Sequence, residues 1–368
     1  MELQKYLRAK GLENLSREFK IKINRHSDLP NLVCLKYSQL ESPMVEKIVQ
    51  QCRGIILDEA NDWQIVSYPY DKFFNYGEAH APQLDWDTAR VYEKLDGSLM
   101  TLYYYQEKWR VQSSGMADAT GQVGGFPYNF SQLFWKVWQE LNYQLPQETD
   151  YCFMFELMTP YNRIVVRQNN NSLVLHGVRN VLTLVEEDIN NWGDKYDWQL
   201  VNSYPLQTIE EIITASNILD PMDSEGYIVC DGRSPRSAHR NFNRIKIKSP
   251  QYVAISHLKT GFSTRRIIEI VVTNEGEEFL AYYPEWKELY QQVRDKYDAL
   301  VRDIETDYAQ YKDIPVQKDF ALAIKHLAYS GILFALRKAK VDSIRQSLKE
   351  TPIHKLEALL KIDFVELV

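Results

Sequence analysis

The hydrophobic pattern of the chain changes near residue 260, and this change most constrains what the chain can fold into. Before that point, short runs of aromatic and β-branched residues are separated by turn signals. They predict strands at 31–37, 54–58, 63–69, 99–105, 109–113, 151–157, 173–178, 226–230 and 245–248. Predicted helices are fewer, at 44–51, 130–141 and 208–215. Because strands and helices do not alternate regularly, we predict an α+β domain on antiparallel sheets rather than a doubly wound one.

After residue 260 the period becomes helical. Apolar residues from Trp286 to Tyr311 recur every three or four positions, which predicts one long helix that Pro315 ends. Further helices are predicted at 318–338, 341–349 and 353–360. A chain of 368 residues exceeds the size at which one hydrophobic core keeps growing. We therefore predict two domains, at 1–258 and at 259–368, the second of them all helical.

Composition restricts the class of protein. Hydrophobic residues make up 45% of the chain and charged residues 25%, as in soluble globular proteins, which excludes a disordered chain or a coiled-coil rod. No apolar run is long enough to cross a bilayer, and the N-terminus has no signal-peptide pattern. We therefore expect a cytoplasmic protein with no membrane partner. The four scattered cysteines indicate buried apolar residues rather than disulfides or a zinc site.

Positive charge is concentrated in one stretch of this acidic chain. The net charge of −7 argues against a protein that coats nucleic acid nonspecifically. Between Arg233 and Arg266, however, nine basic residues occur without an acidic one: 233, 236, 240, 244, 246, 248, 259, 265 and 266. Such a stretch indicates an anionic ligand, and a basic surface loop is the alternative.

The sharpest local motif is Lys94-Leu95-Asp96-Gly97, which leads into a predicted strand. An Asp-Gly turn can present a lysine at a strand edge close to a ligand. Lysine acts as a nucleophile once neighbouring cations or burial favour its neutral form. Taken alone, the tetrapeptide is more often a surface turn with a solvated lysine.

Other charged residues occupy unusual places beside apolar runs. Glu156 lies within an apolar strand, an unfavourable position unless a metal or a hydroxyl group uses it. Lys246 and Lys248 share one face of a predicted strand, where like charges repel unless they face anions. Further charges of this kind are Arg53, Lys72 and Glu225. Each of these, taken singly, is more often a solvated charge at a strand end.

The order of these motifs resembles that of covalent nucleotidyltransferases. K-x-D-G comes first and is followed by an acid on an apolar strand, then by E-G before a strand, and last by K-apolar-K. ATP-dependent ligases and RNA capping enzymes belong to that superfamily. The segments 52–55, 72–75 and 160–165 resemble the tRNA-repairing RNA ligases of T-even bacteriophages. The resemblance covers most of residues 30–258, whereas the C-terminal part matches only in size and helical character. One departure is Ser114, where the family carries a lysine.

The resemblance implies a nucleotidyltransferase domain that binds ATP in a cleft between antiparallel sheets. It implies an ATP-dependent RNA ligase in which Lys94 accepts AMP, passes it to an RNA 5′-phosphate, and a 3′-hydroxyl then seals the strand. Magnesium, or manganese in its place, would accompany ATP. The implied partners are RNA with 5′-phosphate and 3′-hydroxyl ends, such as tRNA, and a separate kinase-phosphatase that heals the ends.

Roles consistent with this chemistry follow for the remaining residues. Lys246 and Lys248 would neutralise the transferred phosphate, and Arg53 and Lys72 would hold the β- and γ-phosphates. Glu225 is the first candidate for a metal ligand, and Glu156 for a ribose contact or a second metal ligand. Apolar candidates for the wall of the adenine site are Tyr252, Val178 and Phe155.

Two other classes share some of these features. A GTP-dependent capping enzyme uses the same lysine chemistry but usually carries a small β-barrel where this chain becomes helical, and a DNA ligase is disfavoured on the same ground. A non-catalytic RNA-binding relative is disfavoured because every charged position of the set is filled. The segment from Ile324 to Lys361 contains eight basic residues and three acidic ones. This excess of positive charge indicates a surface that binds the RNA backbone, and solvated helix faces are the alternative.

Overall fold

The computed structural model describes residues 1–124, 126–231, 242–257, 263–341 and 343–362. Within this part, the chain divides into two compact units. Unit 1 comprises Met1–Ser38 and Ser42–Ser256, and unit 2 comprises Gln39–Glu41 and the described residues from His257 onward. The basic residues 233, 236, 240 and 259 lie outside the described residues. No helix in the described ranges is long and apolar enough to span a membrane.

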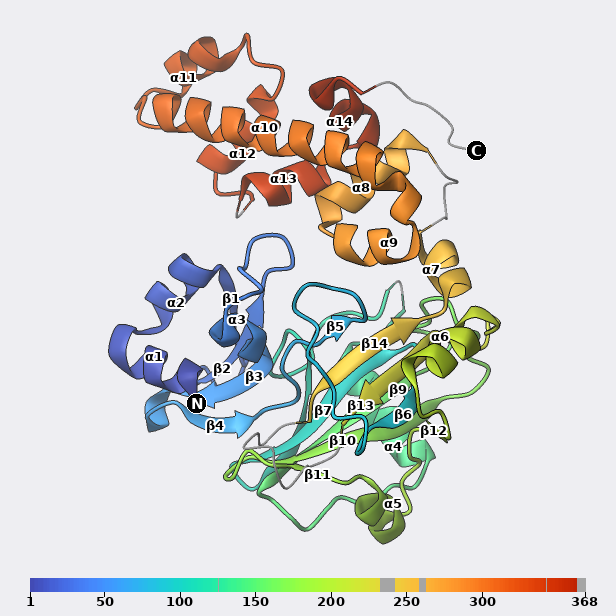
Figure 1. The fold of residues 1–368 in the computed structure, drawn as a ribbon. Coiled ribbons are helices and arrows are strands. Elements are labelled where there is room, and N and C mark those ends of the chain that lie inside the picture. Colours follow the sequence, from blue (N-terminus) through green and yellow to red (C-terminus); the bar gives the residue numbers. More distant parts are fainter. Residues whose placement is uncertain (125, 232–241, 258–262, 342, 363–368) are drawn as a thin grey trace. The chain divides into compact units, whose positions relative to one another are not determined.

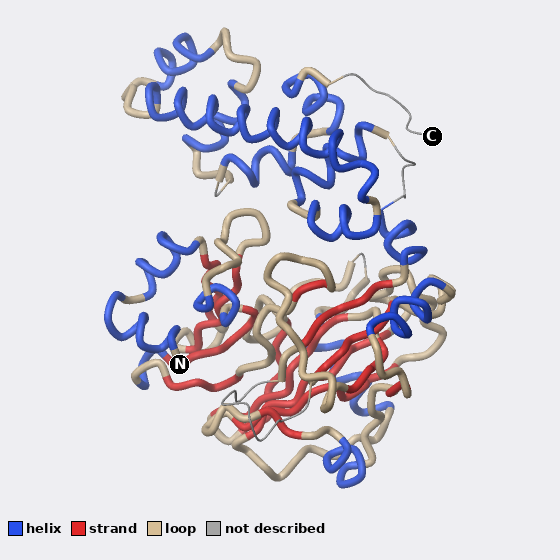
Figure 2. The backbone as a smooth tube through the Cα atoms, in the orientation of Figure 1, coloured by secondary structure: helices blue, strands red, loops and turns tan. Residues whose placement is uncertain are grey.

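Unit 1 contains three β-sheets (Figures 1 and 2). The first has the order β1-β2-β3-β4, with β1 at Ile21–Arg25, β2 at Leu32–Tyr37, β3 at Arg53–Asp58 and β4 at Gln64–Ser67. Helices α1 (Glu2–Lys10), α2 (Leu12–Phe19) and α3 (Lys47–Gln51) accompany it. Apolar side chains of α1, α2 and the strands share one buried cluster, so the N-terminal helices are part of this unit. These two helices and β1 were absent from the sequence prediction.

The second sheet contains the strand that follows the K-x-D-G turn. Its order is β11-β10-β9-β7-β8, with β7 at Ser98–Tyr105, β8 at Lys108–Ser113, β9 at Tyr151–Met158, β10 at Ser172–Asn180 and β11 at Glu186–Glu187. Helix α4 (Phe130–Glu140) packs on it through Phe134 and Trp138, whose rings contact Phe155. A short helix, α5 (Asn190–Tyr196), follows β11. This aromatic cluster is the largest hydrophobic core of unit 1 and makes the sheet a rigid support.

The third sheet lies opposite the second across a cavity. Its order is β12-β6-β13-β14-β5, with β5 at Phe74–Asn75, β6 at Arg90–Glu93, β12 at Ser203–Tyr204, β13 at Gly226–Cys230 and β14 at Arg244–Lys248. Helix α6 (Ile209–Asn217) lies beside β13 and β14 (Figure 1), and α7 (Pro250–His257) follows β14. Strand β14 pairs with β5 in parallel, while the other pairs of named strands are antiparallel. The predicted α+β class with antiparallel sheets is therefore confirmed.

Unit 2 is helical throughout its described residues. Its helices are α8 (Thr264–Thr273), α9 (Gly276–Tyr282), α10 (Lys287–Tyr311), α11 (Gln317–Ile324), α12 (Ser330–Arg337), α13 (Ile344–Glu350) and α14 (Ile353–Leu360). The long predicted helix is α10, whose buried stripe runs from Tyr290 to Ile304. The single helix predicted at 318–338 is wrong, because the chain turns between Ile324 and Ser330 and starts again at Ser330-Gly331, two weak helix formers.

Candidate active site

The predicted nucleophile turn connects two sheets of unit 1. Lys94 follows β6 of the third sheet, and β7 of the second sheet begins at Ser98. The backbone N–H of Lys94 donates to the carbonyl of Gly226 at 2.8 Å, which ties the turn to the start of β13. A Cβ atom at Gly97 would lie 2.5 Å from the carbonyl oxygen of Leu157. Glycine is therefore required for the turn to lie this close to β9.

Asp96 holds the turn from within. Its side chain is 3% exposed, and Oδ2 accepts hydrogen bonds from the backbone N–H groups of Val165 and Val166 at 2.8 and 2.7 Å. Tyr252 of α7 donates its hydroxyl hydrogen to Oδ1 at 2.9 Å. These three donors satisfy a carboxylate that would be costly to bury alone. The aspartate of K-x-D-G is therefore a structural anchor for the lysine.

Lys94 lies beside Glu225 and Lys248. Its Nζ is 2.5 Å from Glu225 Oε2, and Lys248 Nζ is 3.6 Å from Oε1 of the same carboxylate. The side chain of Glu225 is 6% exposed, so this pair is well shielded from water. The residue before β13, the turn lysine and the last residue of β14 thus meet at one point, as the sequence predicted for a common site.

A cavity of about 1030 Å³ lies between the second and third sheets, and Lys94 is one of its lining residues. Four of the predicted charged residues line it together with the lysine: Arg53, Glu156, Lys246 and Lys248. On β14, Ile245 and Ile247 are buried, whereas the alternate residues face this cavity. Glu225 lines a smaller adjoining cavity of about 210 Å³ that also reaches Lys94. The volume and the three lysines suit a nucleoside triphosphate.

A histidine that the sequence analysis missed lies beside Glu156. His176 of β10 places Nε2 3.4 Å from Glu156 Oε2, and its Nδ1 lies 2.9 Å from the Tyr70 hydroxyl. Both Glu156 and His176 line the Lys94 cavity. A lone histidine in an apolar strand gives no signal of this kind in the sequence, because its partner is known only once the strands are paired.

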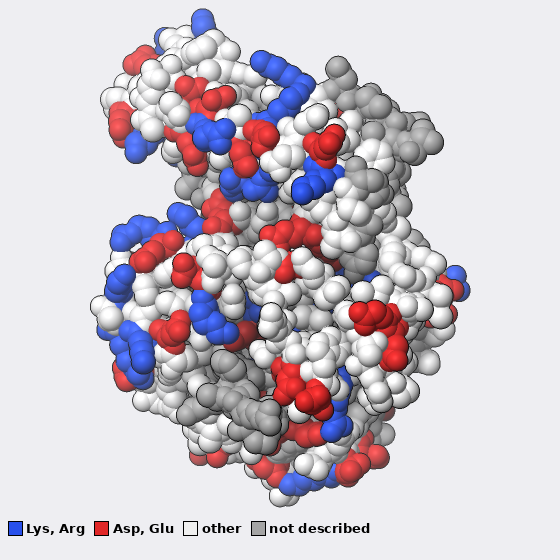
Figure 3. Space-filling view, viewed as in Figure 1, with Lys and Arg blue, Asp and Glu red and all other residues white. Residues whose placement is uncertain are grey.

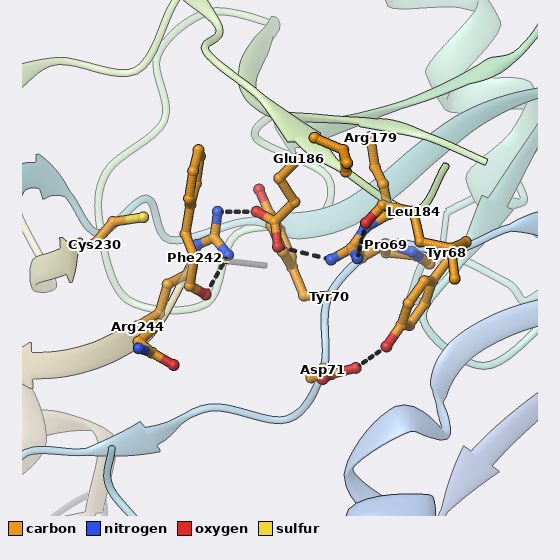
Figure 4. Close-up of polar contacts among 12 residues, drawn as sticks. Tyr68, Pro69, Tyr70, Asp71, Arg179, Leu184, Glu186, Cys230, Phe242 and Arg244 are labelled. Carbon is orange, nitrogen blue, oxygen red and sulfur yellow. Dashed lines mark hydrogen bonds and ion pairs between the residues drawn. The ribbon is translucent and has the colours of Figure 1, made fainter. Parts of the chain in front are cut away.

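Strand β14 is fixed by a buried charge network (Figure 4). Glu186 of β11, which is 2% exposed, accepts from Arg179 at 2.7 Å and from Arg244. Arg179 is fully buried over the ring of Tyr68, and the Arg244 guanidinium lies 4.4 Å from the ring centre of Tyr70. Arg244, which the sequence grouped with the two lysines, thus uses its charge to hold β14 to β11.

The structure places two predicted ATP-binding residues outside the Lys94 cavity. Lys72 lines a separate hollow and lies 4.9 Å from the ring centre of Phe74. Tyr252 is 3% exposed and directed at Asp96. The other two candidates for the adenine wall, Val178 and Phe155, lie in the main core at 1% and 0% exposure. Apolar residues that do line the cavity include Leu99, Ile189, Val201 and Ile228, and the aromatic residues Tyr70, Phe73, Tyr92 and Phe242 line it too.

Arg53 and Ser114 both lie near a cation that the sequence analysis passed over. Arg53 stacks on Phe73 at 4.8 Å from the ring centre. Ser114, the position of the expected but missing lysine, accepts a hydrogen bond from Lys36 Nζ at 2.6 Å. A positive charge therefore does reach this place, from β2 of the first sheet.

The carboxylates that were predicted to bind metal form no complete metal site by themselves. In the described residues, no group of three or more Asp, Glu, His or Cys side chains is arranged to hold a metal ion. Mg²⁺ commonly takes one or two carboxylates and completes its shell with substrate phosphates and water. Glu225 and Glu156 fit a metal of that kind, one that arrives with a nucleotide.

Comparison with known proteins assigns the family. The model of the family described as RNA ligase matches residues 51–252, more than half of the chain and all of the residues that meet at Lys94. The chain belongs to the RNA ligase family.

Two relatives match this member of the RNA ligase family over most of its length. An RNA ligase of Rhodothermus phage RM378 is 25% identical and covers 83% of this chain and 85% of the phage protein. A protein of Autographa californica nuclear polyhedrosis virus, named for polynucleotide kinase and RNA ligase functions, is 24% identical over 98% of this chain. The chain spans 53% of that viral protein, about half of its length. A solved archaeal ATP-dependent RNA ligase matches at 13% identity and a TM-score of 0.46, over 90% of each chain.

Proposed function

We propose that this chain is an ATP-dependent RNA ligase that joins a 5′-phosphate to a 3′-hydroxyl. The observation that carries the proposal is the position of Lys94, which is fixed by its K-x-D-G turn with Nζ 2.5 Å from Glu225 and lines a large cavity together with other cations. Membership of the RNA ligase family supports RNA as the substrate. The relative from phage RM378, which matches over most of both chains, supports it further.

In the first step, the amine of Lys94 would attack the α-phosphorus of ATP. A P–N bond forms, the bond to the β-phosphate oxygen breaks, and pyrophosphate leaves. The Lys94 amine must lose its proton for this, and Glu225 Oε2 at 2.5 Å is the nearest carboxylate oxygen that can accept or share it. Lys246 and Lys248 would neutralise charge on the transferred phosphate.

The carboxylates would serve the nucleotide in two ways. Glu225 would hold Lys94 before the nucleotide binds and would take part in binding Mg²⁺ or Mn²⁺ with the phosphates. The metal supplies charge neutralisation at the phosphates when it is bound. Glu156, which lines the Lys94 cavity beside His176, would accept hydrogen bonds from ribose hydroxyls or a metal-bound water. Leu99 and Ile228 replace Tyr252 as the apolar residues offered to adenine.

The two later steps complete ligation. AMP would pass from Lys94 to the RNA 5′-phosphate, and the 3′-hydroxyl would then displace AMP. We propose a role in RNA repair, as in the tRNA-repairing ligases of T-even phages that the motifs resemble. The viral relative, whose name includes polynucleotide kinase, spans about twice this chain, which supports a partner kinase-phosphatase that heals the ends.

The helical unit 2 is proposed to recognise RNA. Arg337 and Arg345 of its basic segment make internal contacts with Pro315 and Asp298, and Asp342 lies outside the described residues. The exposed basic residues are lysines 325, 338, 340, 349, 355 and 361. On the face drawn in Figure 3, basic and acidic side chains are interspersed. Lysines on such helices contribute affinity that falls with salt.

The experiment that tests the proposal compares nucleotides. Incubation of the protein with magnesium and either ATP or GTP labelled at the α-phosphate should label it with ATP only, through an acid-labile, base-stable phosphoramidate. The labelled protein should then seal RNA that carries a 5′-phosphate. Labelling by GTP alone would replace the ligase assignment by a capping enzyme.

A further inference from the structure

Two cations lie side by side at the edge of the first sheet. On β2 and β3, Lys36 and Arg53 are directly opposite each other in the antiparallel register. Directly opposite residues of antiparallel strands have Cα atoms about 5 Å apart and side chains on the same face. Like charges in this arrangement are unfavourable unless each has its own counter-charge.

Neither cation has such a counter-charge among the residues that the structure describes. In that part of the chain no carboxylate pairs with Lys36 or Arg53, and Arg53 Nη1 is buried without a hydrogen-bond partner. Among the described residues, Lys36 Nζ donates to the neutral hydroxyl of Ser114 at 2.6 Å. Burial, and after it the nearby charge of Arg53, lowers the pKa of Lys36 to about 8. A partly buried lysine and arginine with no anion between them are typical of a site that awaits one.

The backbone is shaped to bring Ser114 to this place. The register of β2 and β3 shifts next to Lys36, and Gly54 has a positive φ of 89°. A Cβ atom at Gly54 would lie 3.1 Å from the carbonyl oxygen of Ser114, so only glycine allows the segment after β8 to approach β3. Gln112 donates to the carbonyl of Gly54 and fixes that approach. The irregular pairing of β2 and β3 and the glycine at position 54 therefore bring the Ser114 hydroxyl close to Lys36.

This cluster borders the Lys94 cavity through Arg53. Arg53 itself lines that cavity, and its guanidinium packs on the ring of Phe73. Lys246 Nζ, from β14, lies 5.9 Å from the centre of the same ring. Lys246 and Lys94 both line the cavity. A polyphosphate whose α-phosphorus lies at Lys94 would extend past Lys246 towards Arg53. Lys72, the residue first predicted to accompany Arg53, lines a different hollow.

We propose that Lys36, Arg53 and Ser114 form a phosphate subsite for the terminal phosphates of the triphosphate, which leave as pyrophosphate when Lys94 is modified. This inference rests on the proposed function and adds Lys36, from β2, as a residue that binds the leaving group. Lys36 would donate a charged hydrogen bond to a phosphate oxygen, and Ser114 would hold its ammonium group in place. No bond to Lys36 forms or breaks in this role.

The test measures binding of inorganic tripolyphosphate to the full-length protein by titration calorimetry. Lys36→Met keeps the apolar stem and removes the charge, and we expect it to weaken binding about tenfold to a hundredfold, the usual effect of one hydrogen bond between charged groups. The matched control is Lys22→Met, because Lys22 is exposed on β1 and lies opposite Lys36 in the register. It should weaken binding less than threefold, and Lys36→Arg should keep most of the affinity. Equal affinity of Lys36→Met and wild type, or equal losses in the Lys36 and Lys22 variants, would overturn the subsite.

A second measurement separates this subsite from the proposed function. Sealing of RNA that already carries an adenylylated 5′ end needs no triphosphate, so Lys36→Met should slow labelling by ATP while leaving this reaction nearly at the wild-type rate. Loss of sealing with unchanged labelling would overturn the assignment to the triphosphate. If the wild type binds tripolyphosphate through Lys36 but never labels Lys94, the subsite stands and the ligase proposal fails.

A third readout needs no variant. Groups facing Lys36 are Arg53, Lys22, the buried Cys34 thiol and Ser114. An anion bound to Lys36 should raise the pKa of this lysine above about 8, so binding at pH 8 should take up protons. Calorimetry in two buffers of different ionisation enthalpy measures that uptake. Binding without proton uptake at pH 8 would contradict contact with Lys36.

Discussion

Lys94 Nζ lies 2.5 Å from Glu225 Oε2, and this contact joins the K-x-D-G turn to the segment that opens β13. The lysine is therefore held in place before any nucleotide binds. The same contact has to break when Lys94 attacks phosphorus. We therefore expect two roles for Glu225, holding Lys94 in place and binding the metal, and these roles can be separated by mutation.

Removal of the Glu225 carboxylate should slow labelling of Lys94 by ATP about a hundredfold or more, since both the position of the lysine and a metal ligand are lost. Manganese should restore the labelling rate of Glu225→Ala in part, because it compensates for a lost metal ligand. It should not restore the labelling rate of Lys246→Ala, which lacks a fixed charge directed at the phosphate. Labelling rates at increasing manganese measure this, and an equal response in both variants would count against Glu225 as a metal ligand.

Asp96 should matter more for stability than its exposed neighbours on the turn. Asp96→Ala leaves two backbone N–H groups and the Tyr252 hydroxyl without their acceptor, which should cost about 2–4 kcal/mol in the free energy of unfolding. Tyr252→Phe removes one of these donors and should cost about 1 kcal/mol. Urea denaturation measures both. If Tyr252→Phe strongly lost affinity for ATP without a lower free energy of unfolding, Tyr252 would be a nucleotide-binding residue after all.

The buried network around Glu186 should support β14. Glu186→Gln leaves Arg179 and Arg244 without a balancing charge and should lower the free energy of unfolding by about 3–5 kcal/mol. The control is Glu140→Gln at the exposed pair with Lys136, where little change is expected. Similar denaturation midpoints for the two variants would show that the network does not hold the strand.

Stability should depend on pH through Lys36. Its pKa is lowered from 10.5 to about 8 in the folded protein, so the unfolded chain binds more protons between these values. The free energy of unfolding should therefore rise with pH from about 8 to 10.5 relative to Lys36→Met, which lacks this titration. Urea denaturation of both proteins over that range measures the difference. A constant difference would show that Lys36 titrates normally.

The exposed lysines of unit 2 should contribute to RNA binding. Lys338→Ala combined with Lys340→Ala should weaken binding of an RNA stem-loop and reduce the slope of log affinity against log salt by about 0.7 for each lysine that contacts phosphate. The control is Lys108→Ala, an exposed lysine of β8 in unit 1. Fluorescence anisotropy at several salt concentrations measures the slope, and an unchanged slope would mean that these helix faces are simply solvated.

The sequence predicted well what depends on local pattern. The strands that carry Glu156 and Lys248 were predicted within two residues of their ends, because alternating apolar residues and flanking turns mark them. Helix α10 followed from its apolar stripe. Helices α1 and α2 were missed because they are short and rich in charged residues, and few of their side chains are buried against the first sheet.

Long-range partnerships could not be predicted in the same way. Tyr252 is an aromatic residue near the motif lysines, which suggested a base-stacking role, yet the fold directs its hydroxyl to Asp96. Lys36 carries no motif, and its importance appears only when β2 is placed opposite Arg53 and beside Ser114. Arg244 looked equivalent to Lys246 on the strand, but the fold places it beside Glu186 of β11, which belongs to the other sheet.

The most direct test of the central claim is the mass of the protein after incubation with ATP and magnesium. Intact-protein and peptide mass spectrometry should show one added AMP, on the peptide that contains Lys94. Lys94→Ala should show none, while its far-ultraviolet circular dichroism matches the wild type. Wild-type protein that gains no AMP, or undiminished labelling of Lys94→Ala, would contradict the assignment of Lys94 as the nucleophile.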